Sequence, residues 1–139
     1  MPDKFHCGTM NTPAIAGLNE GIRFVLREGA ENIGAHEKLL ADEFRLNLMN
    51  IGGITVYGRG DTGITSFNIN GIESAETARL IGDNFAVRAG YHCAPLAHRA
   101  LGSENGGSVR VSFGYFNTRR EMKKLTDKIM HIMRDIKRV

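Results

Sequence analysis

Two stretches in the first part of the chain repeat apolar residues at helical spacing. The first spans residues 13–29 and follows Asn11 and Thr12, both of which are good helix caps. The second spans residues 31–49. Its predicted inner face comprises Ile33, Leu39, Leu40, Phe44 and Leu48. The pattern therefore predicts a pair of helices that precedes the rest of the fold.

The pattern changes at Gly52 and Gly53, where short runs of β-branched and aromatic residues replace the helical spacing. A helix is predicted over residues 74–84 and one helical turn over 96–101. Because strands and helices alternate, we expect an α/β (α+β) fold with a small mixed sheet and helices packed on one face. The predicted strands are residues 54–57, 65–69, 85–88 and 109–114.

The last helix has the clearest start signal. Thr118 and Glu121 have the spacing of a capping box, in which each side chain accepts a hydrogen bond from the other residue's backbone amide. The one plausible domain boundary lies well before this helix in the sequence, at Gly52-Gly53. It divides a helical segment, residues 1–51, from a small α/β domain, residues 52–139. The apolar stripe of the last helix is Met122, Leu125, Ile129, Ile132, Met133 and Ile136.

Composition narrows the functional classes. A hydrophobic content of 42% in 139 residues allows one modest core. The net charge of +3 reflects basic residues concentrated in the last helix, where a solvated face explains them better than nucleic-acid binding. There is no secretory pattern, no apolar run long enough for a bilayer, and no disulfide framework in Cys7 and Cys93. We therefore expect a cytoplasmic protein that binds neither membrane nor nucleic acid.

The segment from Arg88 to Cys93 is the best candidate for chemistry. Arg88, His92 and His98 surround Cys93 in sequence, and cationic neighbours favour the thiolate, which is the reactive form of cysteine. A partly buried structural cysteine is an equally good interpretation of the spacing alone. A metal site is disfavoured, because this loop offers fewer ligands than a closed zinc site needs.

Arg110 is the second candidate. It alternates with apolar residues on a predicted strand and so shares a face with Ser112 and Gly114. An arginine there suits bidentate binding of a carboxylate ligand. From the residues alone, a salt bridge to an Asp or Glu of the same chain is the better explanation.

Three segments resemble, in the same order, motifs of one family: residues 5–12 (Phe-His-Cys-Gly-Thr-Met-Asn-Thr), residues 88–95 (Arg-Ala-Gly-Tyr-His-Cys-Ala-Pro) and residues 109–118. The family is the Suf-type branch of the cysteine desulfurases and selenocysteine lyases, in the class V aminotransferase group. The resemblance covers essentially the whole chain but only the C-terminal third of such enzymes. It implies the C-terminal domain of a pyridoxal-phosphate-dependent transferase fold.

The resemblance also implies roles for individual residues. Cys93 matches the cysteine that accepts sulfur and becomes a persulfide, and Arg110 matches the arginine that binds the substrate carboxylate. Arg88 and His92 match loop residues that hold or tune that cysteine near the substrate.

The N-terminal motif implies a cofactor contact. Thr9 matches a threonine that contacts the pyridoxal phosphate of the partner subunit across a homodimer, and Gly8 and Asn11 belong to the same motif. A helix N-terminus suits a phosphate, although Thr and Asn before Pro are also ordinary caps. His6 and Cys7 depart from the family's usual residues.

The family's Schiff-base lysine lies in a larger upstream domain, and no lysine here stands in a comparable context. We therefore expect the isolated chain to be inactive, and residues 1–51 to abut the missing domain. The implied substrate is L-cysteine or L-selenocysteine, with alanine as product, a sulfur-acceptor protein as partner and iron–sulfur cluster assembly as the process served. The alternative is a non-enzymatic persulfide carrier or partner subunit.

Overall fold

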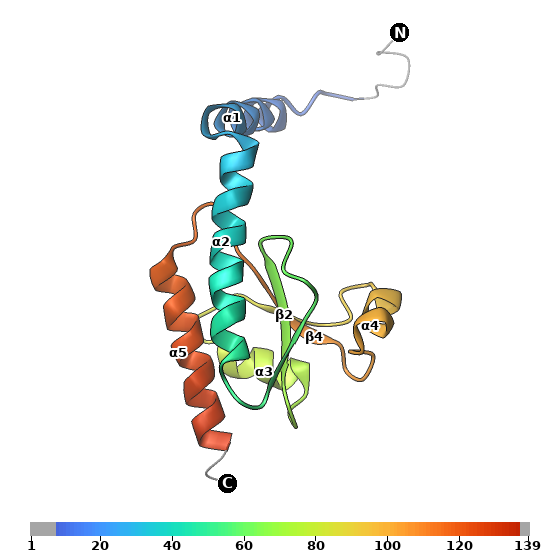
Figure 1. The fold of residues 1–139 in the computed structure, drawn as a ribbon. Helices are drawn as coiled ribbons and strands as arrows, with labels where there is room; N and C mark the ends of the chain where they lie inside the picture. Colours follow the sequence, from blue (N-terminus) through green and yellow to red (C-terminus); the bar gives the residue numbers. More distant parts are fainter. Residues whose placement is uncertain (1–7, 137–139) are drawn as a thin grey trace. The chain divides into compact units, whose positions relative to one another are not determined.

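The structure is a computed structural model and describes residues 8–136. It has two compact units, divided between Ile33 and Gly34, and each is described here by itself. The helices are α1 (Thr12–Glu28), α2 (Ala30–Met49), α3 (Ser74–Ile81), α4 (Pro95–Leu101) and α5 (Arg119–Ile136). The strands are β1 (Ile54–Tyr57), β2 (Ile64–Ile69), β3 (Arg88–Gly90) and β4 (Ser108–Ser112) (Figure 1).

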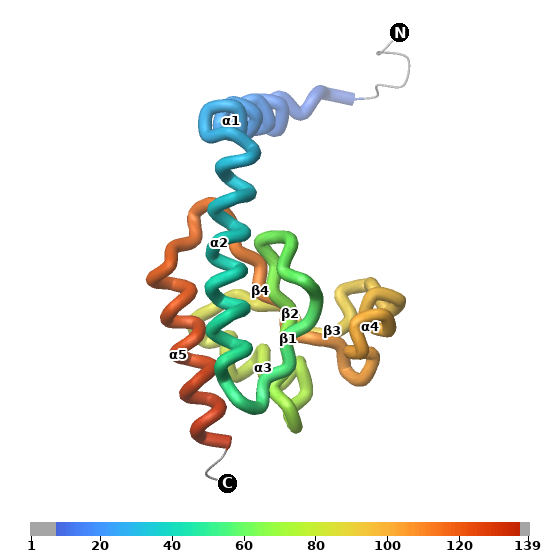
Figure 2. The backbone as a smooth tube through the Cα atoms, in the orientation of Figure 1, coloured from blue at the N-terminus to red at the C-terminus, as the bar shows by residue number. Residues whose placement is uncertain are grey.

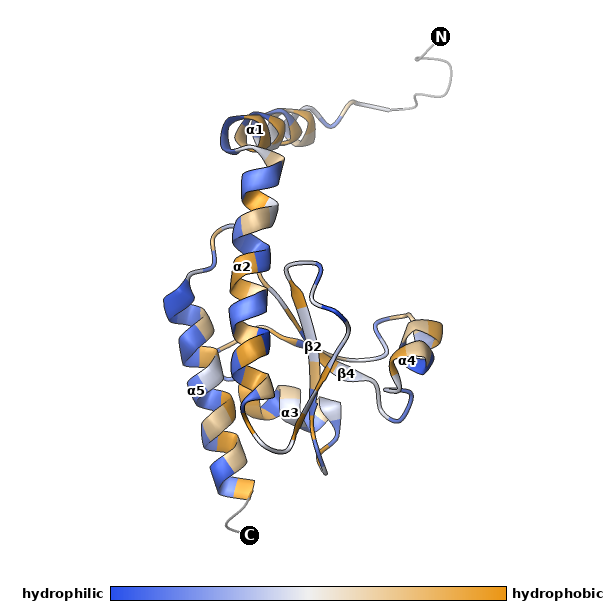
Figure 3. Cartoon of the chain, in the orientation of Figure 1, coloured by the Kyte–Doolittle hydropathy of each residue, from blue (hydrophilic) through white to orange (hydrophobic). Residues whose placement is uncertain are grey.

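Helix α1 forms as the sequence predicts. The Asn11 side-chain oxygen accepts a hydrogen bond from the Ala14 amide at 3.2 Å, and Pro13 occupies the first turn. Gly29 ends the helix with a φ of 83°, a value that favours glycine. No residue of α1 is buried, and both apolar and polar residues lie along it (Figure 3). Its exposed apolar residues include Ile15, Leu18, Ile22, Val25 and Leu26.

The second unit is built on a four-stranded sheet of order β1-β2-β4-β3 (Figure 2). All three pairings are antiparallel, with Thr65 opposite Val111 and Arg88 opposite Arg110. The expected α/β class is confirmed, but the expected mixture of strand directions is corrected. Strands β2 and β3 do run parallel, joined through α3, but β4 lies between them, so no two parallel strands are hydrogen-bonded.

One face of the sheet carries the core. Phe67 packs edge-on against Phe44 of α2, with ring centroids 6.1 Å apart, and Phe113 does the same at 5.5 Å. Strands β2 and β4 add Ile69, Val109 and Val111, and helices α2, α3 and α5 contribute the other buried apolar residues, so the prediction of helices on one face is confirmed. Helices α2 and α5 lie side by side (Figure 1), and the Arg119–Glu43 ion pair joins them at 2.9 Å.

The predicted inner face of α2 is wrong at Leu39, which is 48% exposed. The buried stripe consists of Leu40, Ala41, Phe44 and Leu48. Successive helical residues are rotated by about 100°, so a stripe centred on Phe44 and Leu48 includes position 41 and excludes position 39. Small Ala41, and not Leu39, is therefore part of the buried face of α2.

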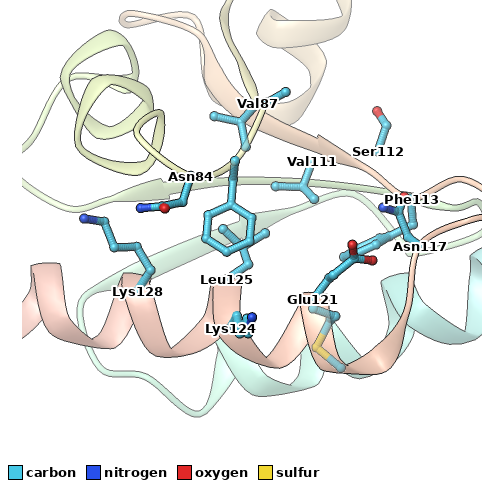
Figure 4. Close-up of a pocket in the computed structure, with 13 residues that line it drawn as sticks. Asn84, Val87, Val111, Ser112, Phe113, Asn117, Glu121, Lys124, Leu125 and Lys128 are labelled. Atoms are coloured by element: carbon cyan, nitrogen blue, oxygen red, sulfur yellow. The ribbon is translucent and has the colours of Figure 1, made fainter.

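Three predicted elements shift by two residues or more at one end. Helix α3 ends at Ile81 rather than at 84, and β4 covers Ser108–Ser112 rather than 109–114. Strand β3 covers Arg88–Gly90 rather than 85–88. Its ladder with β4 stops at the pair Arg88–Arg110, and residues 85–87 line a hollow of about 700 Å³ together with Val111 of β4 and residues of α5 (Figure 4). A strand needs a partner, and over 85–87 the ladder provides none.

The capping box of α5 is confirmed. The Thr118 amide donates to Glu121 Oε2 at 2.8 Å, and the Glu121 amide donates to Thr118 Oγ1 at 3.3 Å. The apolar stripe that follows is buried from Met122 to Met133, whereas Ile136 is 37% exposed. No helix within residues 8–136 is long and apolar enough to cross a membrane.

Thr118→Ala is expected to lower the free energy of unfolding by about 1 kcal/mol, because it removes a side-chain cap from the first turn of α5. Urea denaturation followed by circular dichroism measures the change. Thr62→Ala is the matched control, since Thr62 is exposed in a turn, and it should change stability by less than about 0.5 kcal/mol. Equal effects of the two substitutions would contradict a stabilising role for the box.

Candidate functional site

The face of the sheet opposite the core carries two adjacent arginines. Arg88 on β3 lies directly opposite Arg110 on β4, so both side chains leave the sheet on the same side. Ser66 is the register partner of Arg110 on β2, and Ser112 follows two residues later. The prediction that Arg110 shares a face with small polar residues is therefore confirmed.

This arginine pair has no anionic partner within residues 8–136, and Arg110 Nε is buried without a hydrogen bond. The salt bridge that the residues alone favoured is thus absent from the described part of the chain. Like charges opposite each other across two strands are destabilising. Two unpaired guanidinium groups and an orphaned donor make this face suited to an anionic ligand, such as a carboxylate.

Cys93 occupies a turn, residues Tyr91–Ala94, called here the cysteine turn. The Ala94 amide donates to the Tyr91 carbonyl at 2.8 Å. His92 and Cys93 have φ values of 50° and 59°, as in a type I′ turn, and no other non-glycine residue from 8 to 136 has a positive φ. Such conformations cost about 1–3 kcal/mol each and cluster at active sites.

The Cys93 side chain is exposed on this turn. The alternative of a partly buried structural cysteine is therefore wrong. An exposed thiol, on a turn whose His92 is close enough to Arg88 and Arg110 to be repelled by them, favours the nucleophile interpretation. Cys7, the other cysteine of the sequence, lies outside the described residues, as does His6.

Two side chains of the cysteine turn, those of Tyr91 and His92, attach the turn to its surroundings. The Tyr91 hydroxyl donates to the Glu104 carbonyl at 2.6 Å and accepts from the Gly106 amide at 3.3 Å. His92 Nε2 lies 3.2 Å from the Ser108 carbonyl oxygen. The turn is thereby tied both to the loop before β4 and to β4 itself.

Gly107 allows this loop to approach the turn. A Cβ at position 107 would lie 2.3 Å from the carbonyl carbon and oxygen of Gly90, and the φ of Gly107 is 72°. Only glycine fits such a contact. The end of β3, which leads into the cysteine turn, therefore packs directly on the backbone of the loop.

The pKa of His92 lies below its ordinary value. Burial is the main cause, and repulsion from Arg110, His98 and Arg88 adds to it, while the hydrogen bond with Ser108 opposes it. His92 is therefore neutral near pH 7, and the expectation that it is a cationic neighbour of Cys93 is corrected. Because a carbonyl oxygen only accepts, Nε2 carries the proton and Nδ1 remains an acceptor.

The N-terminal motif lies in the other unit. Gly8 and Thr9 are exposed, and Gly8 has a φ of 89°. Asn11 is engaged as the α1 cap, and the Thr12 amide donates to the Met10 carbonyl at 2.9 Å. Since Pro13 has no amide hydrogen, the first turn of α1 has few free donors for a phosphate. A phosphate contact here would fall to Gly8 and Thr9.

The described lysines lie on other elements than the one that carries Cys93. Lys38 donates to Asp42 Oδ2 at 2.6 Å and to the Gly60 carbonyl, and Lys123, Lys124 and Lys128 are on α5. None of them is on β3, β4 or the cysteine turn. The described residues thus fit a carboxylate and offer a modest phosphate contact, and none of the lysines between residues 8 and 136 is on the elements that carry Cys93, Arg88 and Arg110. Across positions 8–136 no cluster of His, Cys, Asp and Glu could hold a metal.

Sequence reasoning missed Tyr91, Gly107 and Ser103 as parts of this site. The hydroxyl oxygen of Ser103 lies 2.8 Å from Nδ1 of His98. The Gly106-Gly107 pair was a visible signal of an unusual backbone. The contacts of Tyr91 and Ser103 had no local signal, because they depend on how the loop before β4 folds back.

The chain belongs to the aminotransferase class V family, whose model matches residues 1–125. It is 35% identical over 137 residues to a probable cysteine desulfurase of Methanothermobacter thermautotrophicus, covering 94% of this chain and 34% of that protein. It is 34% identical over 133 residues to a cysteine desulfurase of Haloferax volcanii, covering 93% of this chain and 31% of that protein. The chain thus spans about a third of the length of each of these two relatives.

Solved structures agree with this assignment. The apo structure of the cysteine desulfurase from Thermococcus onnurineus NA1 superposes with a TM-score of 0.86 at 29% identity, covering 96% of this chain and 34% of that one. The cysteine desulfurase CsdA of Escherichia coli superposes with a TM-score of 0.82 at 22% identity, over 96% of this chain and 33% of that one, which indicates the shared fold. The expected family and fold are confirmed.

Proposed function

We propose that this chain is the C-terminal, sulfur-accepting part of a pyridoxal-phosphate-dependent cysteine desulfurase. The observation that carries the proposal is the exposed Cys93 on a strained turn beside two unpaired arginines. The similarity to cysteine desulfurases over nearly the whole chain supports it. The proposed domains are the helical segment 1–51, which would abut the larger domain, and the small domain 52–139.

In this proposal Arg110, aided by Arg88, binds the carboxylate of L-cysteine or L-selenocysteine. Because the carboxylate is fixed, the substrate sulfur is held at a set distance from Cys93. The Cys93 thiolate forms an S–S bond with that sulfur while the substrate C–S bond breaks. The electron pair of the C–S bond stays on the carbon fragment, which takes up a proton and leaves as alanine. Neutral His92 orients the turn through Ser108.

The cofactor belongs mainly to the part of the protein outside this chain. When bound, pyridoxal phosphate serves as the electron sink that makes the substrate's C–S bond cleavable. Thr9 and Gly8 would contact its phosphate, with Asn11 capping the adjacent helix, across a homodimer. A lysine from the larger domain would anchor it. The isolated chain is accordingly expected to release no alanine.

The proposal also includes a sulfur-acceptor protein as partner, iron–sulfur cluster assembly as the process served and a cytoplasmic setting. The exposed thiol also suits the second candidate, a non-enzymatic persulfide carrier. Joining the chain to a lysine-bearing large domain separates the two candidates. A desulfurase then releases alanine from L-cysteine, whereas a carrier does not.

The sulfur-accepting role is tested on the chain itself. Incubation with a small-molecule persulfide is expected to add one sulfur atom to Cys93, detected by peptide mass spectrometry. Cys93→Ser should abolish the adduct, and Cys7→Ser, which keeps the exposed thiol, should leave it intact. An adduct confined to Cys7 would overturn the proposal.

A further inference from the structure

Helix α4 does not bury its apolar residues, as an amphipathic helix usually does. Its only buried side chain is that of His98, which is 5% exposed. The apolar residues Leu96 and Leu101 are 74% and 43% exposed. Histidine is intermediate in its tendency to be buried, and leucine is among the residues most often inside. A histidine in the interior at the expense of two leucines calls for a specific reason.

That reason lies in what the His98 side chain touches. Its Nδ1 atom is 2.8 Å from the hydroxyl oxygen of Ser103, which is itself buried. Its ring lies edge-on to Tyr91 at a centroid distance of 5.5 Å and is tilted against His92 at 5.7 Å. Its backbone amide donates to the Ala94 carbonyl at 3.2 Å. His98 therefore contacts three of the four residues of the cysteine turn.

The turn needs such support. His92 and Cys93 both hold left-handed conformations that side chains rarely adopt, and strain of this kind persists only where the surroundings fix it. Tyr91 is fixed by the loop at 104–106, and His92 by Ser108. Without the imidazole behind them, Tyr91 and His92 would lose the surface on which both side chains rest.

We propose that His98 is the positioning residue of the cysteine turn. Its ring supports Tyr91 and His92 from behind, and the Ser103 hydroxyl fixes the angle of that ring. Cys93 is thereby presented on a turn that would otherwise relax. The proposal rests on the proposed function only in the purpose of the turn, which is to present sulfur, and not in its geometry.

The test separates the ring from its hydrogen bond. His98→Asn removes the ring but keeps a polar group at the Nδ1 position. Ser103→Ala keeps the ring but frees its orientation. His131→Asn is the matched control, because His131 is an exposed histidine on α5. Each variant is studied in the full 139-residue chain by hydrogen exchange and by nuclear magnetic resonance titration of His92.

In His98→Asn, protection of the Ala94 amide is expected to fall about tenfold relative to the wild type, because two ring contacts are lost. The pKa of His92 should rise towards its ordinary value as water reaches its ring and the repulsion from His98 is lost. Ser103→Ala should give a smaller change in the same direction. His131→Asn should change neither quantity, and exchange of the buried Ile129 amide reports global stability.

Wild-type values at Ala94 and His92 in a folded His98→Asn chain would overturn the proposal. If His98→Asn does not fold, Ser103→Ala decides, and its matching the wild type would overturn it equally. In the lysine-bearing enzyme, His98→Asn should lower kcat about tenfold with the KM for L-cysteine unchanged, since the arginines are intact. If wild-type Cys93 takes no sulfur while His98→Asn still loosens the turn, the proposed function fails and the positioning role stands.

Discussion

Replacing Phe44 with alanine is expected to lower the free energy of unfolding by about 3–5 kcal/mol. The Phe44 side chain is fully buried, and its ring packs edge-on against both Phe67 and Phe113. The substitution leaves a cavity between α2 and the sheet that aromatic neighbours cannot close. Urea denaturation monitored by circular dichroism measures the loss as a lower midpoint.

Leu46→Ala is the matched control for this prediction. Leu46 lies two residues further along α2 and is 61% exposed, so its truncation should change stability by less than about 0.5 kcal/mol. Similar midpoints for Phe44→Ala and Leu46→Ala would contradict a core centred on Phe44.

Arg110→Gln is expected to lower kcat/KM for L-cysteine about 100-fold in the lysine-bearing enzyme, because hydrogen bonds to charged groups are worth about 1.5–3 kcal/mol. Arg110 has an orphaned, buried Nε and no ion pair within residues 8–136, so its donors are available to a substrate carboxylate. Steady-state measurement of alanine release gives the ratio.

Two further variants sharpen the Arg110 prediction. Arg110→Lys keeps the charge but loses the planar fork, so its activity should fall between those of the wild type and Arg110→Gln. Arg99→Gln removes an exposed arginine on α4 and should leave kcat/KM unchanged. If Arg99→Gln and Arg110→Gln reduced turnover equally, a general effect of charge would replace specific carboxylate binding.

The helices of this protein were largely predictable because their signals are local. Asn11 before Pro13 and the spacing of Thr118 and Glu121 specify helix starts through hydrogen bonds between near neighbours. The inner face of α2 was less certain, because both Leu39 and Leu40 are apolar and only the packed sheet selects between them. The limits of β3 depend on where β4 stops pairing, which is a property of two distant segments.

The candidate site divides in the same way. The residue types around Cys93 indicated a nucleophile, and the alternation on β4 correctly assigned Arg110 to the polar face. The left-handed turn was not predicted, because Cys93 is not a residue type that signals a positive φ and a histidine signals it only weakly. The burial of His98 could not be predicted from its short helix, because leucine is buried more often than histidine and both leucines of that helix are exposed.

The left-handed backbone at positions 92 and 93 has a consequence for how this sequence can vary. Glycine would occupy either position without strain, and at position 93, where the side chain is exposed, relief of that strain favours the replacement. Retention of a thiol there runs against that preference. A descendant relieved of its sulfur chemistry would therefore be free to drift towards glycine at the nucleophile's own position and gain stability from the loss.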